Sequence, residues 1–113
     1  MTVSEWVRVA DAAEIEPETA LRVEIDGVPV AIFNLDGEFH ALDDTCSHAE
    51  ASLSEGDLDP ERCAIECPLH GSSFDLRTGD PITLPAVEPV RVHHVEVDGD
   101  GMLRVALSEA VAP

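Results

Sequence analysis

Two short stretches decide the architecture of this chain: CSHAEASLSEG at residues 46–56 and ECPLHGSSFDLRTG at residues 66–79. Each contains a cysteine followed closely by a histidine, Cys46 with His48 and Cys67 with His70, and eighteen residues (49–66) separate the two pairs. Two loops that each supply one thiolate and one imidazole make a four-ligand site. A zinc ion would bind all four ligands in one tetrahedron, whereas a [2Fe–2S] cluster would take the thiolates on one iron and the imidazoles on the other.

Regular β patterns flank these stretches on both sides. Asp26-Gly27 and Asp36-Gly37 are strong signals for two-residue hairpin turns, and apolar residues alternate with polar ones around them. A capping box at Asp11 and Glu14 predicts a single short helical turn. We expect strands at residues 3–9, 21–25, 28–33, 39–42, 90–97 and 102–107, so that the two end regions form an antiparallel β unit.

The middle of the chain, residues 43–89, has a different pattern. It is rich in glycine and proline, and it holds all three cysteines and two of the five histidines. Only short strands fit there, at residues 63–66 and 72–76, with a turn at residues 77–80. The pattern predicts an all-β scaffold, one domain over residues 1–113, that presents a metal site on loops.

Charge narrows the range of functions. The 113 residues include 24 acidic side chains against six basic ones, all arginine, for a formal net charge of −18. Phosphate binding needs clustered Lys or Arg, so nucleic acids and anionic membrane surfaces are poor partners. Basic protein surfaces are good partners. A solvated acidic surface that keeps the protein in solution is the simpler explanation, and the two explanations are compatible.

The sequence also bears on location. No apolar run approaches the ~20 residues that a membrane helix needs, and residues 1–14 have neither the basic nor the apolar region of a signal peptide. We therefore expect a cytoplasmic protein. Three cysteines, an odd number, favour metal binding or redox chemistry over a disulfide framework.

Taken together, the two cysteine–histidine stretches resemble those of Rieske-type [2Fe–2S] proteins, strongly over residues 43–79 and more weakly over the flanking strands. The resemblance implies the Rieske fold, in which an antiparallel β-sandwich-like base carries a small loop-rich cluster-binding subdomain, here about residues 43–85. It implies that Cys46 and Cys67 ligate the inner iron and that His48 and His70 ligate the outer iron near the surface. The spacer is slightly longer than usual for the family, and we expect the extra residues at a hairpin tip within residues 57–62.

Departures from the high-potential respiratory members of the family predict a low reduction potential. Those proteins brace the two cluster loops with a disulfide, but the corresponding positions here are Ala51 and Leu69. They also place a serine and a tyrosine after the second histidine, whose hydroxyls bond to cluster sulfurs. Ser72 matches the first, and Phe74 replaces the second. A missing donor and strongly negative surroundings both stabilise the oxidised state, so we expect a potential near about −150 mV.

The chain is most similar to soluble Rieske ferredoxins that serve non-haem iron oxygenases such as ring-hydroxylating dioxygenases. The resemblance implies a one-electron carrier and not an enzyme. A flavin-containing ferredoxin reductase would supply the electron from NAD(P)H, and a terminal oxygenase would accept it. We expect a monomer that forms transient complexes. Two alternatives stay open: a Rieske protein of iron–sulfur assembly, redox homeostasis or a reductase, and a zinc-stabilised interaction module.

The remaining candidate residues read as structural. Cys63 is expected to be a small buried hydrophobe on a strand, and the adjacent His93 and His94 are expected to face opposite sides of a strand. Acidic residues between the ligand pairs are candidates for docking a basic partner: Glu50, Glu55, Asp57 and Asp59. The other expectations are Trp6 and Phe33 in the core, Phe74 beneath the second ligand loop, His40 as an ordinary strand residue, and Pro85 in a third loop that covers the cluster.

Overall fold

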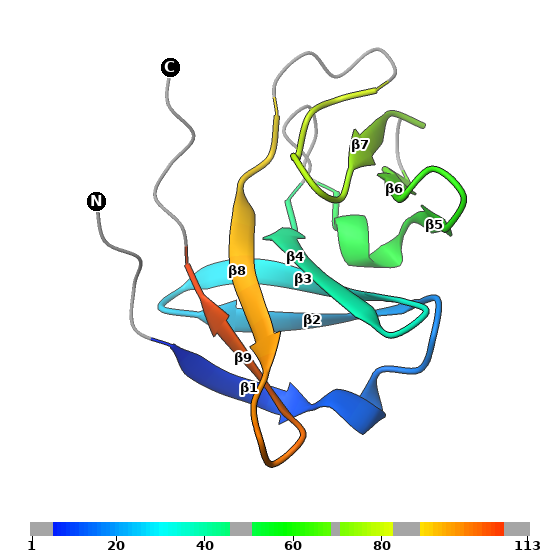
Figure 1. Cartoon of the computed structure of the whole chain (residues 1–113). Coiled ribbons are helices and arrows are strands. Elements are labelled where there is room, and N and C mark those ends of the chain that lie inside the picture. Colours follow the sequence, from blue (N-terminus) through cyan, green and yellow to red (C-terminus); the bar gives the residue numbers. More distant parts are fainter. Residues whose placement is uncertain (1–5, 46–50, 69–70, 83–88, 108–113) are drawn as a thin grey trace.

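The computed structural model describes residues 6–45, 51–68, 71–82 and 89–107, and these form two antiparallel sheets (Figure 1). In chain order the elements are β1 (Val7–Asp11), the single-turn helix η1 (Ala12–Glu14), β2 (Thr19–Ile25), β3 (Val28–Leu35), β4 (Glu38–Asp43), the single-turn helix η2 (Leu53–Glu55), β5 (Asp57–Asp59), β6 (Ala64–Glu66), β7 (Ser73–Asp75), β8 (Val92–Val97) and β9 (Met102–Ala106). The six-stranded sheet has the order β1-β9-β8-β4-β3-β2, and the three-stranded sheet has the order β5-β6-β7. The expected all-β antiparallel fold is confirmed.

Two aspartate–glycine turns set the register of the β2–β3–β4 meander. Asp26 and Gly27 have φ values of 51° and 81°, and Asp36 and Gly37 have 53° and 93°. Positive φ at both central residues is the geometry of the two-residue turn that matches strand twist. The first turn pairs Ile25 with Val28, so both hairpins lie where the sequence predicts them.

Strand β3 is buried on both faces and separates two hydrophobic cores. Its alternating side chains point in opposite directions, with Val30 and Ile32 on one side and Ala31 and Phe33 on the other. The first core lies inside the six-stranded sheet and includes Leu103 and Val105 of β9. The second lies between that sheet and the smaller one and includes Ile65, Cys67, Phe74 and Leu76.

The six-stranded sheet forms the base, and its two halves meet along a short seam. Strands β4 and β8 pair only at Ala41 with His93 and at Leu42 with Val92. Around this seam the sheet bends, so that β2–β4 and the β1–β9–β8 half enclose one core (Figure 1). Both end regions of the chain therefore contribute to one base, as the sequence predicts.

Asn34 and the first helical turn close one end of the base. The capping box is present: the Asp11 carboxylate accepts a hydrogen bond from the Ala13 N–H, and the Glu14 carboxylate accepts one from the Asp11 N–H. The buried Asn34 amide donates to the Ile15 carbonyl at 2.7 Å and accepts from the Gly37 N–H at 2.8 Å.

The N-terminal strand differs from the prediction. It runs over Val7–Asp11, two residues further than expected, and Val3 lies outside the described residues. Trp6 is 40% exposed and is not in the core. It precedes an edge strand, where its ring lies against Arg104 and the exposed His94. Among the described segments, the only helices are two single turns, and neither could cross a membrane.

Candidate metal centre

The second ligand stretch forms a tight loop between β6 and β7. Cys67 follows β6 directly, its N–H donates to the Ser72 carbonyl at 2.7 Å, and its carbonyl accepts from the Gly71 N–H at 3.0 Å. Gly71 has a φ of 74°, which glycine adopts without strain. Glu66 and Ser73 then pair as the two strands resume. The smaller sheet therefore fixes the backbone of Cys67.

The Cys67 side chain is fully buried in the core beneath this loop. Phe74 is fully buried in the same core, as expected, and its ring carries no hydroxyl. Ser72 is buried as well. A cysteine sulfur held among apolar side chains, with one serine nearby in the loop, could serve as a thiolate ligand of a [2Fe–2S] cluster.

The structure describes only one of the four expected ligands. Cys46, His48 and His70 lie outside the described residues, as does Pro85 of the expected third loop. What the structure places is the base of each loop. Thr45 and Ser52 form an isolated bridge across the base of the first ligand loop, while a hydrogen bond from the Gly71 N–H to the Cys67 carbonyl spans the base of the second.

The part of the chain between β4 and β8, called the insert below, carries both ligand loops and the smaller sheet. A charged cluster links the end of β4 to the start of β8, on the two sides of this insert. The Arg91 Nε lies 2.9 Å from Asp43 Oδ2, and the His93 Nε2 lies 2.8 Å from Asp43 Oδ1. Burial pushes the pKa of Asp43 up, but the hydrogen bonds from His93 and Arg91 outweigh burial and hold that pKa below its usual value. The ionised Asp43 carboxylate thus links the end of β4 to Arg91 and His93, three residues before Cys46.

The third cysteine differs from the prediction. Cys63 precedes β6 in the β5–β6 turn, is only half-buried, and has a φ of 54°. Its Sγ lies 3.9 Å from His40 Nε2, and burial raises the pKa of the thiol. Cys63 and Cys67 stand at opposite ends of β6, a span of roughly 13 Å at the rise of an extended strand.

The histidines of the base lie as the sequence predicts. His93 is buried and His94 exposed on β8, so their side chains face opposite sides. His40 is half-buried on β4, with its Nε2 at 3.3 Å from Glu38 Oε1. In the part of the chain that the structure describes, no three of the His, Cys, Asp and Glu side chains gather as a metal site.

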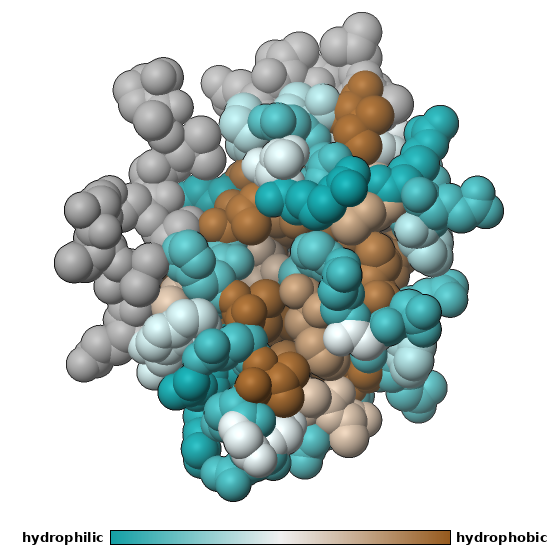
Figure 2. Space-filling view, in the orientation of Figure 1, coloured by the Kyte–Doolittle hydropathy of each residue, from teal (hydrophilic) through white to brown (hydrophobic). Residues whose placement is uncertain are grey.

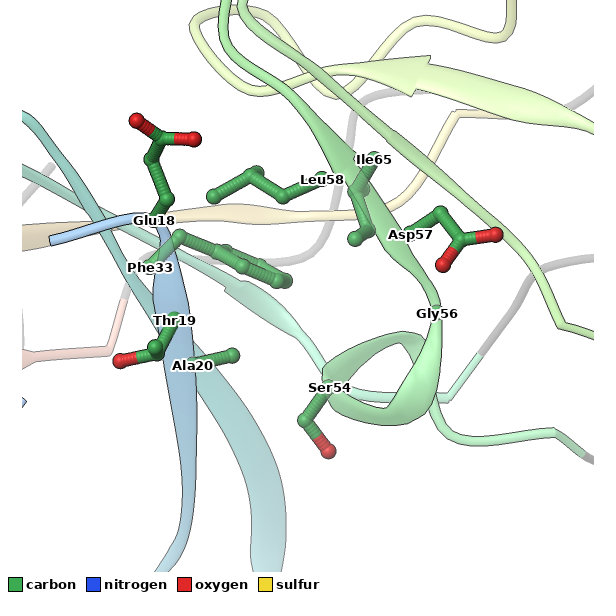
Figure 3. Close-up of a pocket in the computed structure, with 9 residues that line it drawn as sticks. All are labelled: Glu18, Thr19, Ala20, Phe33, Ser54, Gly56, Asp57, Leu58 and Ile65. Carbon is green, nitrogen blue, oxygen red and sulfur yellow. The ribbon is translucent and has the colours of Figure 1, made fainter. Parts of the chain in front are cut away.

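A cavity of about 370 Å³ lies between the base and the smaller sheet (Figure 3). Phe33 reaches into it from the base, and Leu58 and Ile65 approach from the insert (Figure 3). The Glu18 and Asp57 carboxylates point away from the space between them (Figure 3). Both polar and apolar groups thus line the cavity, which opens beside the core that the base and the smaller sheet share.

Local structure between the ligand stretches departs from the sequence prediction. Residues 57–59 form β5, which pairs with β6, so only residues 60–63 form the hairpin tip. Glu55 and Asp57 are exposed and Asp59 is half-exposed, while Glu50 lies outside the described residues. Hydrophilic residues line the right-hand margin of the face shown in Figure 2.

Sequence reasoning missed two functional candidates, Asp43 and Asp44. They stand directly before the first ligand stretch, and each binds an arginine that is distant in sequence. The sequence marks them only as two adjacent aspartates at a strand end, a pattern that solvated acids also show.

Comparison with known proteins places the chain. A family model described as the Rieske [2Fe–2S] domain matches residues 5–96. The 3-phenylpropionate/cinnamic acid dioxygenase ferredoxin subunit of Escherichia coli is 46% identical over 102 residues, which are 90% of this chain and 91% of that protein.

Two solved structures agree. The ferredoxin of carbazole 1,9a-dioxygenase from Nocardioides aromaticivorans is 41% identical, with a TM-score of 0.88 over 93% of this chain and 100% of that one. A ferredoxin in a complex of reduced oxygenase and oxidised ferredoxin, also of carbazole 1,9a-dioxygenase, is 40% identical, with a TM-score of 0.85 over 95% and 97% of the two chains. With its buried Cys67 and its two-sheet fold, this chain belongs to the Rieske [2Fe–2S] domain family and is an electron carrier of the ferredoxin type.

Proposed function

We propose that this chain is the ferredoxin component of a ring-hydroxylating dioxygenase system. It receives one electron from an NAD(P)H-dependent, flavin-containing reductase and passes it to a terminal oxygenase. The supporting observation is the buried Cys67 at the base of a tight, sheet-anchored loop, in a chain that is 46% identical to a dioxygenase ferredoxin subunit.

Four residues are assigned to the cluster in this proposal. Cys46 and Cys67 would hold one iron, and His48 and His70 would hold the other. When bound, the [2Fe–2S] cluster supplies reversible one-electron chemistry, and imidazole ligands raise its potential relative to an all-cysteine cluster. Ser72 can offer a hydroxyl toward the cluster from its loop, whereas Phe74 offers none. These side chains support a potential at the low end of the Rieske range, about −150 mV.

The partners follow from charge and from the role of a shuttle. A carrier must leave each partner quickly, so we assign it small, transient interfaces and a monomeric state. A net charge of −18 attracts basic docking faces on the reductase and on the oxygenase. Exposed Glu55 and Asp57 lie between the two cysteine–histidine pairs and are available to such a face. We place these encounters in the cytoplasm.

The test uses the purified chain and two matched cysteine variants. We expect about two irons per chain, no stoichiometric zinc, and a Rieske-type EPR signal in the reduced protein. Cys67→Ser should lose the visible absorption, whereas Cys63→Ser, at the other end of the same strand, should retain it. A colourless protein with one zinc would refute the proposed cofactor. An unchanged spectrum in Cys67→Ser would refute the ligand assignment.

Electron delivery is tested separately. We expect the protein reduced by a flavin-containing ferredoxin reductase and NADH to be reoxidised by a ring-hydroxylating oxygenase in the presence of its aromatic substrate. The rate should fall as salt is added, because screening weakens the attraction between an acidic carrier and basic partners. A reduced protein that no such oxygenase reoxidises would refute the dioxygenase assignment while leaving the cluster intact.

A further inference from the structure

The two ligand loops are held closed in different ways. The second loop leaves β6 and returns into β7, so paired strands close it. The first loop leaves β4 and returns into the single-turn helix η2, which belongs to neither sheet. Thr45 and Ser52 form one isolated bridge there. Because no paired strands close this loop, other contacts must hold its two ends together.

Asp44 supplies these contacts, and each of its polar groups makes a hydrogen bond. Its backbone carbonyl accepts from the Leu53 N–H, and its Oδ1 accepts from the Ser54 N–H at 2.8 Å. Its backbone N–H donates to the Pro29 carbonyl of β3 at 3.0 Å. Its Oδ2 accepts from Arg22 Nε of β2 at 3.1 Å. One residue thus joins the start of the loop, the end of the loop and two strands of the base.

Burial makes these contacts strong. Asp44 is 1% exposed, while the Arg22 side chain is about half exposed. A buried carboxylate needs its hydrogen bonds, because leaving it unpaired costs far more than leaving an exposed one unpaired. Charge-assisted bonds are also shorter and stronger than neutral ones. The helix turn that follows is anchored too, since Leu53 is fully buried in the core beneath the insert.

We propose that Asp44 is the positioning residue of the first ligand loop: its carboxylate clamps the two ends of the segment that carries Cys46 and His48. This inference rests on the proposed ligand set. Asp44 touches no cluster atom in this role and acts through the backbone of Ser54 and through Arg22. The chain lacks the pair of cysteines that could brace its loops covalently, since Ala51 and Leu69 stand at those positions. The Asp44 clamp supplies a noncovalent brace.

A matched control exists at the far end of the base. The carboxylate of Asp98, in the β8–β9 turn, accepts backbone hydrogen bonds as well: one of its oxygens accepts from the Asp100 and Met102 N–H groups. Its other oxygen pairs with Arg8 Nε at 3.0 Å. That turn lies at the opposite end of the molecule from the insert (Figure 1). Asp98→Ala therefore removes the same kind of contacts without touching a ligand loop.

The experiment measures bleaching of the visible absorption of the oxidised holoprotein in excess EDTA, well below the unfolding temperature. We expect Asp44→Ala to bleach at least about tenfold faster than wild type, which corresponds to about 1.4 kcal/mol. Asp98→Ala should bleach within about twofold of wild type, even though it melts earlier. Equal acceleration in the two variants, or no acceleration in Asp44→Ala, would overturn the proposal.

A milder variant keeps the test decisive if Asp44→Ala does not fold. Asp44→Asn retains an acceptor for the Ser54 N–H but places an amide donor before Arg22. We expect intermediate bleaching and a shifted or broadened reduced-state EPR signal, which Asp98→Ala should not show. A wild-type bleaching rate and signal in Asp44→Asn would count against the clamp.

Hydrogen exchange at the Ser54 amide separates this proposal from the proposed function, because it needs no cluster. We expect slow exchange in the wild type and fast exchange in Asp44→Ala, which lacks the acceptor for this N–H. Slow exchange in both would overturn the clamp even if the cluster is present. Absence of a two-iron cluster in the wild type would instead refute the proposed function, and the exchange result would still test the clamp.

Discussion

Gly79 is the point where the turn after β7 touches the chain that leads into β8, and replacing it tests how tightly the insert is closed. Its N–H donates to the Asp75 carbonyl at 2.7 Å, and its carbonyl accepts from the Val90 N–H at 2.9 Å. Its φ is 77°. A Cβ at this position would lie 2.1 Å from the Val90 carbonyl oxygen and 3.1 Å from Val92 Cγ2. Gly79→Ala must therefore push the two segments apart.

The expected loss of stability has two parts. Holding an alanine in the left-handed region costs about 1 kcal/mol relative to glycine. Separating the segments also breaks the hydrogen bond from the Val90 N–H to the carbonyl of residue 79. Both polar groups then lose their partner, which costs about 1–3 kcal/mol more. The sum is about 2–4 kcal/mol. For a domain of this size that corresponds to a decrease of about 8–17 °C in melting temperature.

Gly27→Ala isolates the first part. Gly27 has nearly the same φ, 81°, but an added Cβ would meet nothing within 4 Å. We expect this variant to lose only about 1 kcal/mol. Thermal unfolding of both holoprotein variants, followed by far-ultraviolet circular dichroism at pH 7, measures the difference. If Gly79→Ala melted no lower than Gly27→Ala, the steric argument at Val90 would be refuted.

Three further outcomes are expected. Asn34→Ala removes two hydrogen bonds from a buried amide and should destabilise the protein by about 2–3 kcal/mol in denaturant unfolding, whereas a loss below 0.5 kcal/mol by the same method would show that water replaces them. Phe33→Leu leaves a space between the two sheets and should lower the free energy of unfolding by about 1–2 kcal/mol. An unchanged denaturant midpoint would contradict this. The carboxyl of Asp43 should titrate below its ordinary value near about 3.9, and its ion pairs should therefore stabilise the fold above about pH 4 and lose that contribution as pH falls through the lowered pKa. Carbon-13 NMR titration checks this, and a pKa that does not rise in Arg91→Gln would contradict it.

The parts of the fold that sequence reasoning predicted correctly are those set by local chemistry. Asp26-Gly27 and Asp36-Gly37 define their turns because few other dipeptides adopt two consecutive positive φ values. The capping box at Asp11 formed for the same reason, since both of its hydrogen bonds lie within four residues. The burial of Phe33 and Phe74 also agreed with the prediction.

The errors arose where distant contacts decide the outcome. Trp6 is strongly apolar, yet it adjoins an edge strand, and edge position depends on which strands pair across the whole chain. Cys63 adopts a positive φ that cysteine rarely shows, because the β5–β6 turn demands it. Strand β5 is three residues long, too short for an alternating pattern to be seen.

The candidate site shows the same division. The spacing of cysteines and histidines predicts the ligand pairs, and the structure adds a buried position for Cys67. The roles of Asp43 and Asp44 could not be read from the sequence, because adjacent acids at a strand end usually face solvent. Their arginine partners, Arg91 and Arg22, lie 48 and 22 residues away and meet them only in the folded chain.

The pairing of β1 with β9 has a consequence for how the protein forms during synthesis. Val7 lies opposite Val105, so the first described strand finds its only sheet neighbour in the last one. The β2–β3–β4 meander and the insert can form from local contacts while the chain is still emerging from the ribosome, but the base stays open until β9 has been made. Pairing between such distant segments is slow. A nascent chain thus carries both ligand stretches before it has the closed base on which the insert rests.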